Sequence, residues 1–85
     1  MSFYANKSLK THIKSLVESF VASEGQTVFT LNNTYEIGKN RLEVTVGGIQ
    51  QYSPSNFTET STTSITFSEG LPMGTKVDVE IMQIN

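Results

Sequence analysis

The sequence predicts a mainly β protein in which one N-terminal α-helix precedes a small antiparallel β-sandwich or barrel. Within residues 1–24, apolar residues recur every three or four positions, which is the period of one helix face. Within residues 25–85 they recur at every second position, which is the period of a half-buried strand. Because strands do not alternate with helices, a parallel sheet is not expected. We therefore expect an N-terminal oligomerisation helix in 1–24 and an antiparallel β-module in 25–85.

The predicted helix runs from Lys7 to Glu24. Asn6 or Ser8 can cap its start, and Gly25 follows its end, where a left-handed residue is often needed. Its lysines lie in the early turns and its glutamates in the late turns, which opposes the helix dipole. Such a helix should be weak alone, so packing of its apolar stripe must stabilise it.

The apolar stripe of this helix has the spacing of a coiled-coil seam. The predicted oligomer interface consists of Leu9, Ile13, Leu16, Val17 and Phe20. Two heptads are short for a coiled coil, and packing of the helix on its own sheet is the alternative interpretation. An 85-residue chain without cysteine cannot be stapled by disulfides, and small chains of this kind often depend on oligomerisation. We therefore expect a homo-oligomer, most simply a trimer.

The expected strands follow the alternating pattern. They cover residues 27–31, 41–46, 49–52, 57–59, 64–68 and 76–84. Gly47 and Gly48 separate two of them, and two glycines suit a two-residue hairpin loop that needs positive φ at both positions. Pro72 and Gly74 indicate a further turn before the last strand.

Composition argues against several classes of partner. The net charge is −2 with only six lysines and arginines, so the clustered positive charge that nucleic acid requires is lacking. No apolar run approaches the ~20 residues of a membrane helix, and no apolar segment of the secretory type follows the N-terminus. We expect no nucleic-acid partner, no membrane insertion, and folding in a cytoplasm.

The sequence also predicts that the protein is not an enzyme. His12 is the single histidine, and there is no cysteine, so neither a metal site nor a catalytic triad can be assembled from the usual residues. Asp78 and Glu80 lie two positions apart, which is the ordinary polar face of a strand. No catalytic residue, cofactor site or metal site is therefore predicted.

Two aromatic residues are candidates for contact with a ligand or partner. Tyr52 and Phe57 lie in or beside predicted loops. Exposed aromatic rings on a β-module can stack on sugars or anchor a protein partner. The alternative interpretation is that these rings simply close a small core.

From residue 25 onward the order of motifs resembles a β-module of bacteriophage tail fibres, tail spikes and appendage proteins. The motifs are "GQTVFTL", "YEIGKN", "RLEVTVGGIQQ", "NFTET" and "TSITFSEGLPMGTKVDVEI". Each is ordinary strand-and-turn chemistry, and the ordered series at matching spacings makes the resemblance. Gly47 stands where such modules usually have Asn or Asp, and Asn56-Phe57 stands in place of Asp-Tyr.

The resemblance implies a virion structural protein without catalytic activity. It would be a trimeric fibre, appendage or adaptor module that is made in the bacterial cytoplasm and assembled into the virion. Its partners would be other copies, other virion proteins, and a glycan or receptor on the host surface. A carbohydrate-binding module and a capsid-decorating protein of the same fold are the alternative functions.

Overall fold

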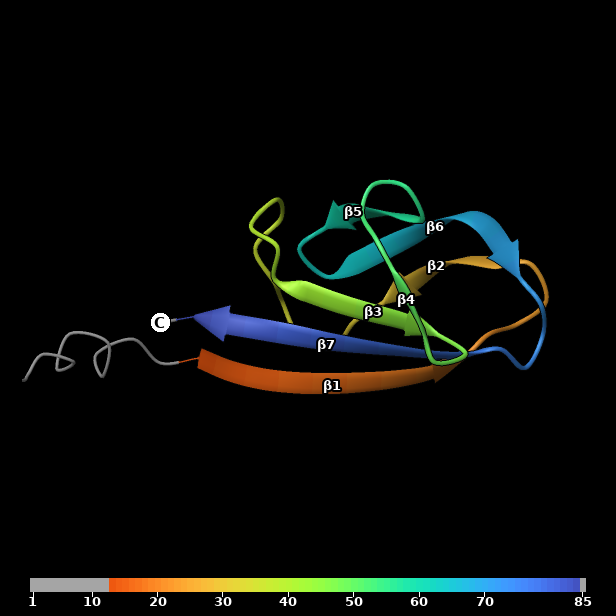
Figure 1. Ribbon diagram of the computed structural model, residues 1–85, viewed down its shortest axis with the longest axis horizontal. Coiled ribbons are helices and arrows are strands. Elements are labelled where there is room, and N and C mark those ends of the chain that lie inside the picture. The colour runs from red at the N-terminus through yellow and green to blue at the C-terminus, as the bar shows by residue number, and fades with distance from the viewer. Residues whose placement is uncertain (1–12, 85) are drawn as a thin grey trace, which may run out of the picture.

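The computed structural model describes residues 13–84, which form seven β-strands joined by loops (Figure 1). They are β1 (Ile13–Val21), β2 (Gln26–Thr30), β3 (Leu42–Val46), β4 (Ile49–Gln51), β5 (Phe57–Ser61), β6 (Ser64–Leu71) and β7 (Lys76–Ile84). Sheet A has the strand order β1-β7-β3-β4, and sheet B has the order β2-β6-β5. All strand pairs are antiparallel.

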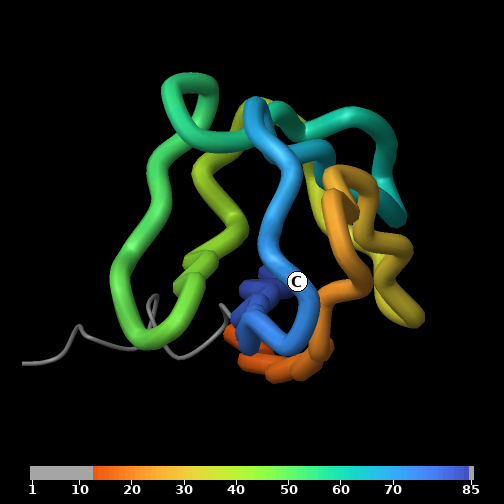
Figure 2. The backbone as a smooth tube through the Cα atoms, turned by 90° about the vertical axis from the view of Figure 1, so that its right-hand side faces the viewer, coloured from red at the N-terminus to blue at the C-terminus, as the bar shows by residue number. Residues whose placement is uncertain are grey.

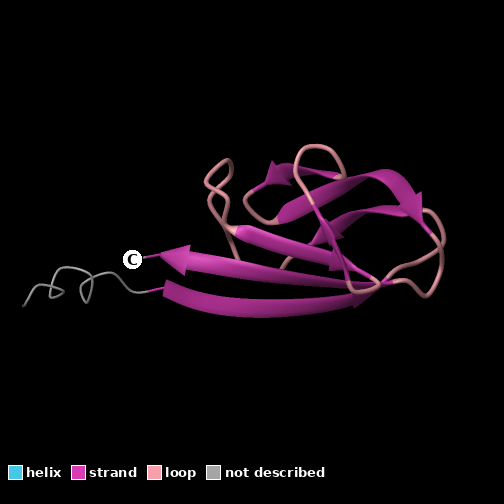
Figure 3. Cartoon of the chain, in the orientation of Figure 1, coloured by secondary structure: helices cyan, strands magenta, loops and turns pink. Residues whose placement is uncertain are grey.

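The predicted fold class is wrong in its N-terminal helix. Residues 13–21 form β1, which pairs with β7 along its whole length from Ile13↔Ile84 to Val21↔Lys76. Figure 3 draws strands and loops in the described part of the chain and no helix. Within that part, no helix could span a membrane. Leu9 and His12 lie outside the described residues.

The physical reason for this correction is that a spacing of four residues satisfies both periods. Ile13, Val17 and Val21 share one helix stripe, yet positions four apart also share one face of a strand. These three residues are β-branched, which favours a strand over a helix. Pairing with β7 then decides the outcome, because it provides hydrogen bonds along the whole segment, whereas the lone helix opposed its own dipole.

The two sheets enclose a core of alternating inward side chains. The largest fully buried residues are Val44, Val77, Val79 and Ile81 from sheet A, and Phe29 and Ile65 from sheet B. The end-on view of Figure 2 shows β1 and β7 side by side, opposite the strands of sheet B. The rings of Phe29 and Phe67 meet edge to face, with centroids 5.5 Å apart.

The β3–β4 hairpin confirms the predicted glycine turn. Gly47 and Gly48 have φ of 57° and 85°, and β3 and β4 pair from Val46↔Ile49 outward. Both angles lie in the left-handed region, which glycine adopts without steric cost. The hairpin ends sheet A on the side opposite β1.

Candidate functional site

The first candidate surface is the outer face of β1, which contains two of the predicted interface residues. Ile13 and Val17 are 66% and 64% exposed, and Val21 on the same face is 72% exposed. Leu16 and Phe20 point the other way and are half-buried against the core. The Phe20 ring packs edge-on against Phe29 at a centroid distance of 5.5 Å. The structure therefore divides the four predicted interface residues that it describes between two faces of one strand.

Polar contacts frame this apolar face. The Ser19 hydroxyl donates to Oδ1 of Asp78 at 2.5 Å, and the Ser15 hydroxyl donates to Glu80. Val17 lies opposite Glu80 in the register, between the two serines. The acidic side chains of β7 thus accept hydrogen bonds from serines of β1. The outer face of β1 presents aliphatic side chains, and the serines between them have hydrogen-bonded hydroxyl groups.

The inner face of β1 contains a buried carboxylate that the sequence analysis did not single out. Glu18 is only 9% exposed. Its oxygens accept hydrogen bonds from the backbone N–H groups of Asn32 and Asn33 at 2.9–3.0 Å, and from Nδ2 of Asn33 at 2.8 Å. These bonds fasten the 31–41 loop, which joins β2 to β3, to β1. The sequence does contain a signal for this position. If residues 13–21 are interpreted as a strand, Glu18 shares the inner face with Leu16 and Phe20.

The second candidate surface is the Tyr52 cleft, a hollow of about 320 Å³ beside β4 and β5. Its lining includes Asn40, Gln50, Gln51, Tyr52, Phe57 and Glu59. The structure therefore brings Tyr52 and Phe57 to one site. Phe57 is buried at 3% exposure with its ring against Phe67, whereas Tyr52 is 59% exposed. Phe57 closes the core, and Tyr52 is the aromatic ring that a ligand can reach.

Local hydrogen bonds hold the loop that carries Tyr52. Oδ1 of Asn56 accepts from the Tyr52 N–H at 2.9 Å, and the Asn56 N–H donates to the Tyr52 carbonyl at 2.7 Å. The N–H of Phe57 donates to the same carbonyl at 3.4 Å. The backbone of Tyr52 is therefore positioned before any ligand arrives, which lowers the ordering cost of binding.

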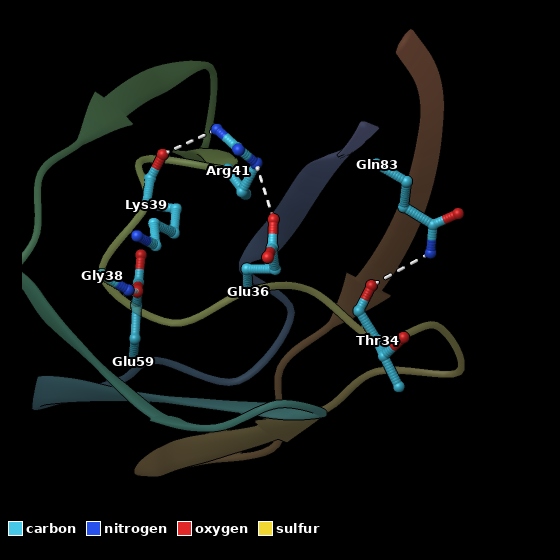
Figure 4. A network of polar contacts seen from close by, with 7 residues as sticks. All are labelled: Thr34, Glu36, Gly38, Lys39, Arg41, Glu59 and Gln83. Carbon is cyan, nitrogen blue, oxygen red and sulfur yellow. Dashed lines mark hydrogen bonds and ion pairs between the residues drawn. The ribbon is translucent and has the colours of Figure 1, made fainter. Parts of the chain in front are cut away.

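The 31–41 loop contributes Asn40 to the lining of the Tyr52 cleft, and Figure 4 shows the polar contacts that hold this loop. The Gly38 N–H donates to Oε1 of Glu59 at 2.7 Å. Arg41 pairs with Glu36 at 3.3 Å and donates from Nη1 to the Lys39 carbonyl at 2.9 Å. One oxygen of Glu59 thus positions the loop. The other oxygen has no hydrogen-bond partner among the described residues.

A further hollow of about 510 Å³ lies between the 31–41 loop and the end of β7. Tyr35 lines it with a buried ring whose hydroxyl donates to the Ser64 carbonyl at 2.8 Å. Burial, and then the nearby charge of Glu59, raise the pKa of Tyr35 to about 12. Tyr35 therefore stays protonated near neutral pH, and it acts as a structural donor that anchors the loop to sheet B.

The described residues contain no group of three His, Cys, Asp or Glu side chains able to hold a metal ion. The chain matches no protein-family model, no curated protein and no solved structure. The resemblance to phage appendage modules therefore depends on the ordered sequence motifs alone.

Proposed function

We propose that this chain is a structural module of a bacteriophage virion that functions by assembly. It joins copies of itself and other virion proteins into a fibre or appendage, and it contributes to attachment to the host. The series of motifs from Gly25 to Ile81 supports the phage assignment. The observation that carries the assembly role is the outer face of β1, where Ile13, Val17 and Val21 are each more than 60% exposed.

Exposed aliphatic side chains on a regular strand are a typical feature of an association surface. Isolated exposed apolar residues are common and need no explanation, but several of them gathered on one face are typical of a site of interaction. Here the row follows one face of a nine-residue strand. The proposal assigns no catalytic role. The number of three copies stays a prediction. It has lost the support of the helical seam, because residues 13–21 form β1.

The assembly role predicts that the purified chain associates in solution. We expect light scattering to give a mass that is a multiple of the 9.4 kDa chain. Val17→Lys should shift the mass toward one chain, because it adds a charge to the centre of the apolar row. Gln50→Lys, an exposed change on β4 at the opposite edge of sheet A, is the matched control and should leave the mass unchanged. A single-chain mass at all concentrations would contradict the proposal.

The phage assignment is tested on particles. Antibodies against the chain, detected by gold labelling in electron microscopy, should label purified virions of the phage that encodes it. Label on a tail or appendage is the expected result. Label over the capsid would identify a decorating protein instead, and absence of the chain from particles by mass spectrometry would refute a virion role.

The Tyr52 cleft favours carbohydrate binding as a second candidate function. An exposed aromatic ring lies beside the amides of Asn40 and Gln50 and the carboxylate of Glu59. Ring stacking combined with planar hydrogen-bonding groups is suited to a sugar ring.

This second function is tested by glycan-array binding of the labelled chain. Tyr52→Ala should reduce binding by about tenfold or more, which corresponds to a loss of roughly 1.4 kcal/mol. Tyr52→Phe retains the ring and should bind nearly normally. Equal binding by all three proteins, or binding by none, would remove the cleft as a sugar site.

A further inference from the structure

The described part of the sandwich has one edge that is long and regular. Sheet B ends in β2 and β5, which have five residues each, and the pairing of both with β6 contains a register shift. Sheet A ends in β4, with three residues, and in β1, with nine. The pairing of β1 with β7 has no shift. Short or bulged edges resist further pairing, so β1 is the edge best able to add a strand.

The backbone of β1 presents hydrogen-bonding groups along this edge. Just beyond β1, the Ala22 N–H donates to the Thr75 carbonyl at 2.8 Å, and the Ala22 carbonyl accepts from Gly74 at 2.9 Å. In an antiparallel pair, successive residues alternate between facing the partner strand and facing away from it. The even-numbered residues of β1 therefore face β7. The N–H and C=O groups of the odd-numbered residues, Ile13 to Val21, point to the open edge.

The outer side chains of β1 are self-complementary. In order they are Ile13, Ser15, Val17, Ser19 and Val21. If a second copy runs antiparallel with Val17 opposite Val17, each aliphatic side chain meets an aliphatic one and each serine meets a serine. Cross-strand pairs of like polarity stabilise a sheet. A register centred on Glu18 would instead place two carboxylates opposite each other, which is unfavourable.

The inner side chains are compatible with the same register. Lys14 of one copy becomes a diagonal neighbour of Glu18 in the second copy, and diagonal neighbours ≈ 7–8 Å apart are within reach of long side chains. The half-buried Leu16 and Phe20 gain cover from the second copy. The directly opposite inner pairs are Leu16 with Glu18 and Lys14 with Phe20, so the inner face tolerates this register through its diagonal Lys14–Glu18 contacts, and the outer face selects it.

We propose that two copies of this chain pair antiparallel through the open edge of β1, about a two-fold axis at Val17, so that two four-stranded sheets join into one. This pairing rests on the assembly role proposed above, and it names a second copy as the occupant of the β1 edge. It differs from the predicted threefold seam because strands and not helices associate, and because two copies meet and not three.

Single-cysteine variants test the register, because the natural chain has no cysteine. A hydrogen-bonded antiparallel pair has Cα atoms about 5.5 Å apart, within the range that a disulfide spans. Val17→Cys should therefore form a disulfide-linked two-chain species in high yield under mild oxidation. Val21→Cys is the matched control. Its two copies would lie eight residues apart along the strand, about 27 Å, and should not cross-link.

Hydrogen exchange supplies a readout of the backbone bonds in the natural chain. The amides of Ser15, Val17 and Ser19 should exchange slowly at high protein concentration and quickly on dilution. Those of Leu16 and Glu18, which face β7, should be slow under both conditions. Slow exchange of the odd-numbered amides in a single-chain species would show that other residues of the same chain cover the edge, and would overturn the pairing.

The outcomes separate this inference from the proposed function. A multiple-chain mass without the Val17→Cys cross-link would mean that another surface associates, so the pairing fails and the assembly role remains. Equal cross-linking at positions 17 and 21 would indicate parallel strands and would also overturn it. A Val17→Cys cross-link in a chain that is absent from virions would leave the pairing intact and refute the phage role.

Discussion

Replacement of Phe29 by alanine is expected to lower the free energy of unfolding by about 3–5 kcal/mol. Phe29 is fully buried on β2, and its ring packs edge to face against Phe20 of β1 and Phe67 of β6. Phe29 therefore lies between Phe20 of sheet A and Phe67 of sheet B, and its ring contributes to packing between the two sheets. A domain of this length has a net stability of roughly 4–13 kcal/mol, so the loss would remove a large part of it.

Urea unfolding followed by circular dichroism measures this effect. Val28→Ala is the matched control, because Val28 is the neighbouring residue of the same strand and is half exposed. It should change stability by less than about 1 kcal/mol. Phe29→Leu should give an intermediate loss if alanine prevents folding. Equal midpoints for the alanine variants at 28 and 29 would contradict the observed orientation of β2.

Glu18→Ala is expected to lower the free energy of unfolding by about 2–3 kcal/mol. The carboxylate is buried and accepts the N–H groups of Asn32 and Asn33. Its removal leaves these donors without an acceptor, and hydrogen bonds to charged groups are worth about 1.5–3 kcal/mol. Glu18→Gln retains one acceptor oxygen and should lose less.

Chemical denaturation and hydrogen exchange distinguish this effect from a general loss of charge. Glu43→Ala removes an exposed carboxylate from the same sheet, and Glu43 lies opposite Glu80 in the register, so the change should be neutral or slightly stabilising. In Glu18→Ala the amides of Asn32 and Asn33 should lose their protection. If they stay protected, the 31–41 loop does not depend on Glu18.

Much of the β-structure follows from local patterns. The alternation of Leu42, Val44 and Val46 predicts a half-buried strand over residues 41–46, and β3 (Leu42–Val46) begins one residue later. The Gly47-Gly48 pair predicts the hairpin, because few residues other than glycine accept two consecutive positive φ values. Both signals lie within a few residues of the structure that they specify, so no distant contact is needed to interpret them.

The candidate sites are less predictable. Their positions near loops make Tyr52 and Phe57 candidates for ligand contact, and both line one cleft, but only the fold separates the exposed ring from the buried one. Asn40 and Glu59 reach the same cleft from a loop and a strand that are distant in sequence. No local sequence pattern predicts that these two residues line the same cleft.

By itself, the sequence predicted six strands between residues 27 and 84, with some ends displaced by up to three residues, and the glycine hairpin, and its lack of cysteine excluded disulfides. Only the tertiary structure decided the state of residues 13–21. A spacing of four fits a helix and a strand equally, so the choice depended on hydrogen bonds with β7, more than fifty residues away in sequence. That pairing also turned Glu18 inward and left the other edge of β1 without a partner strand among residues 13–84.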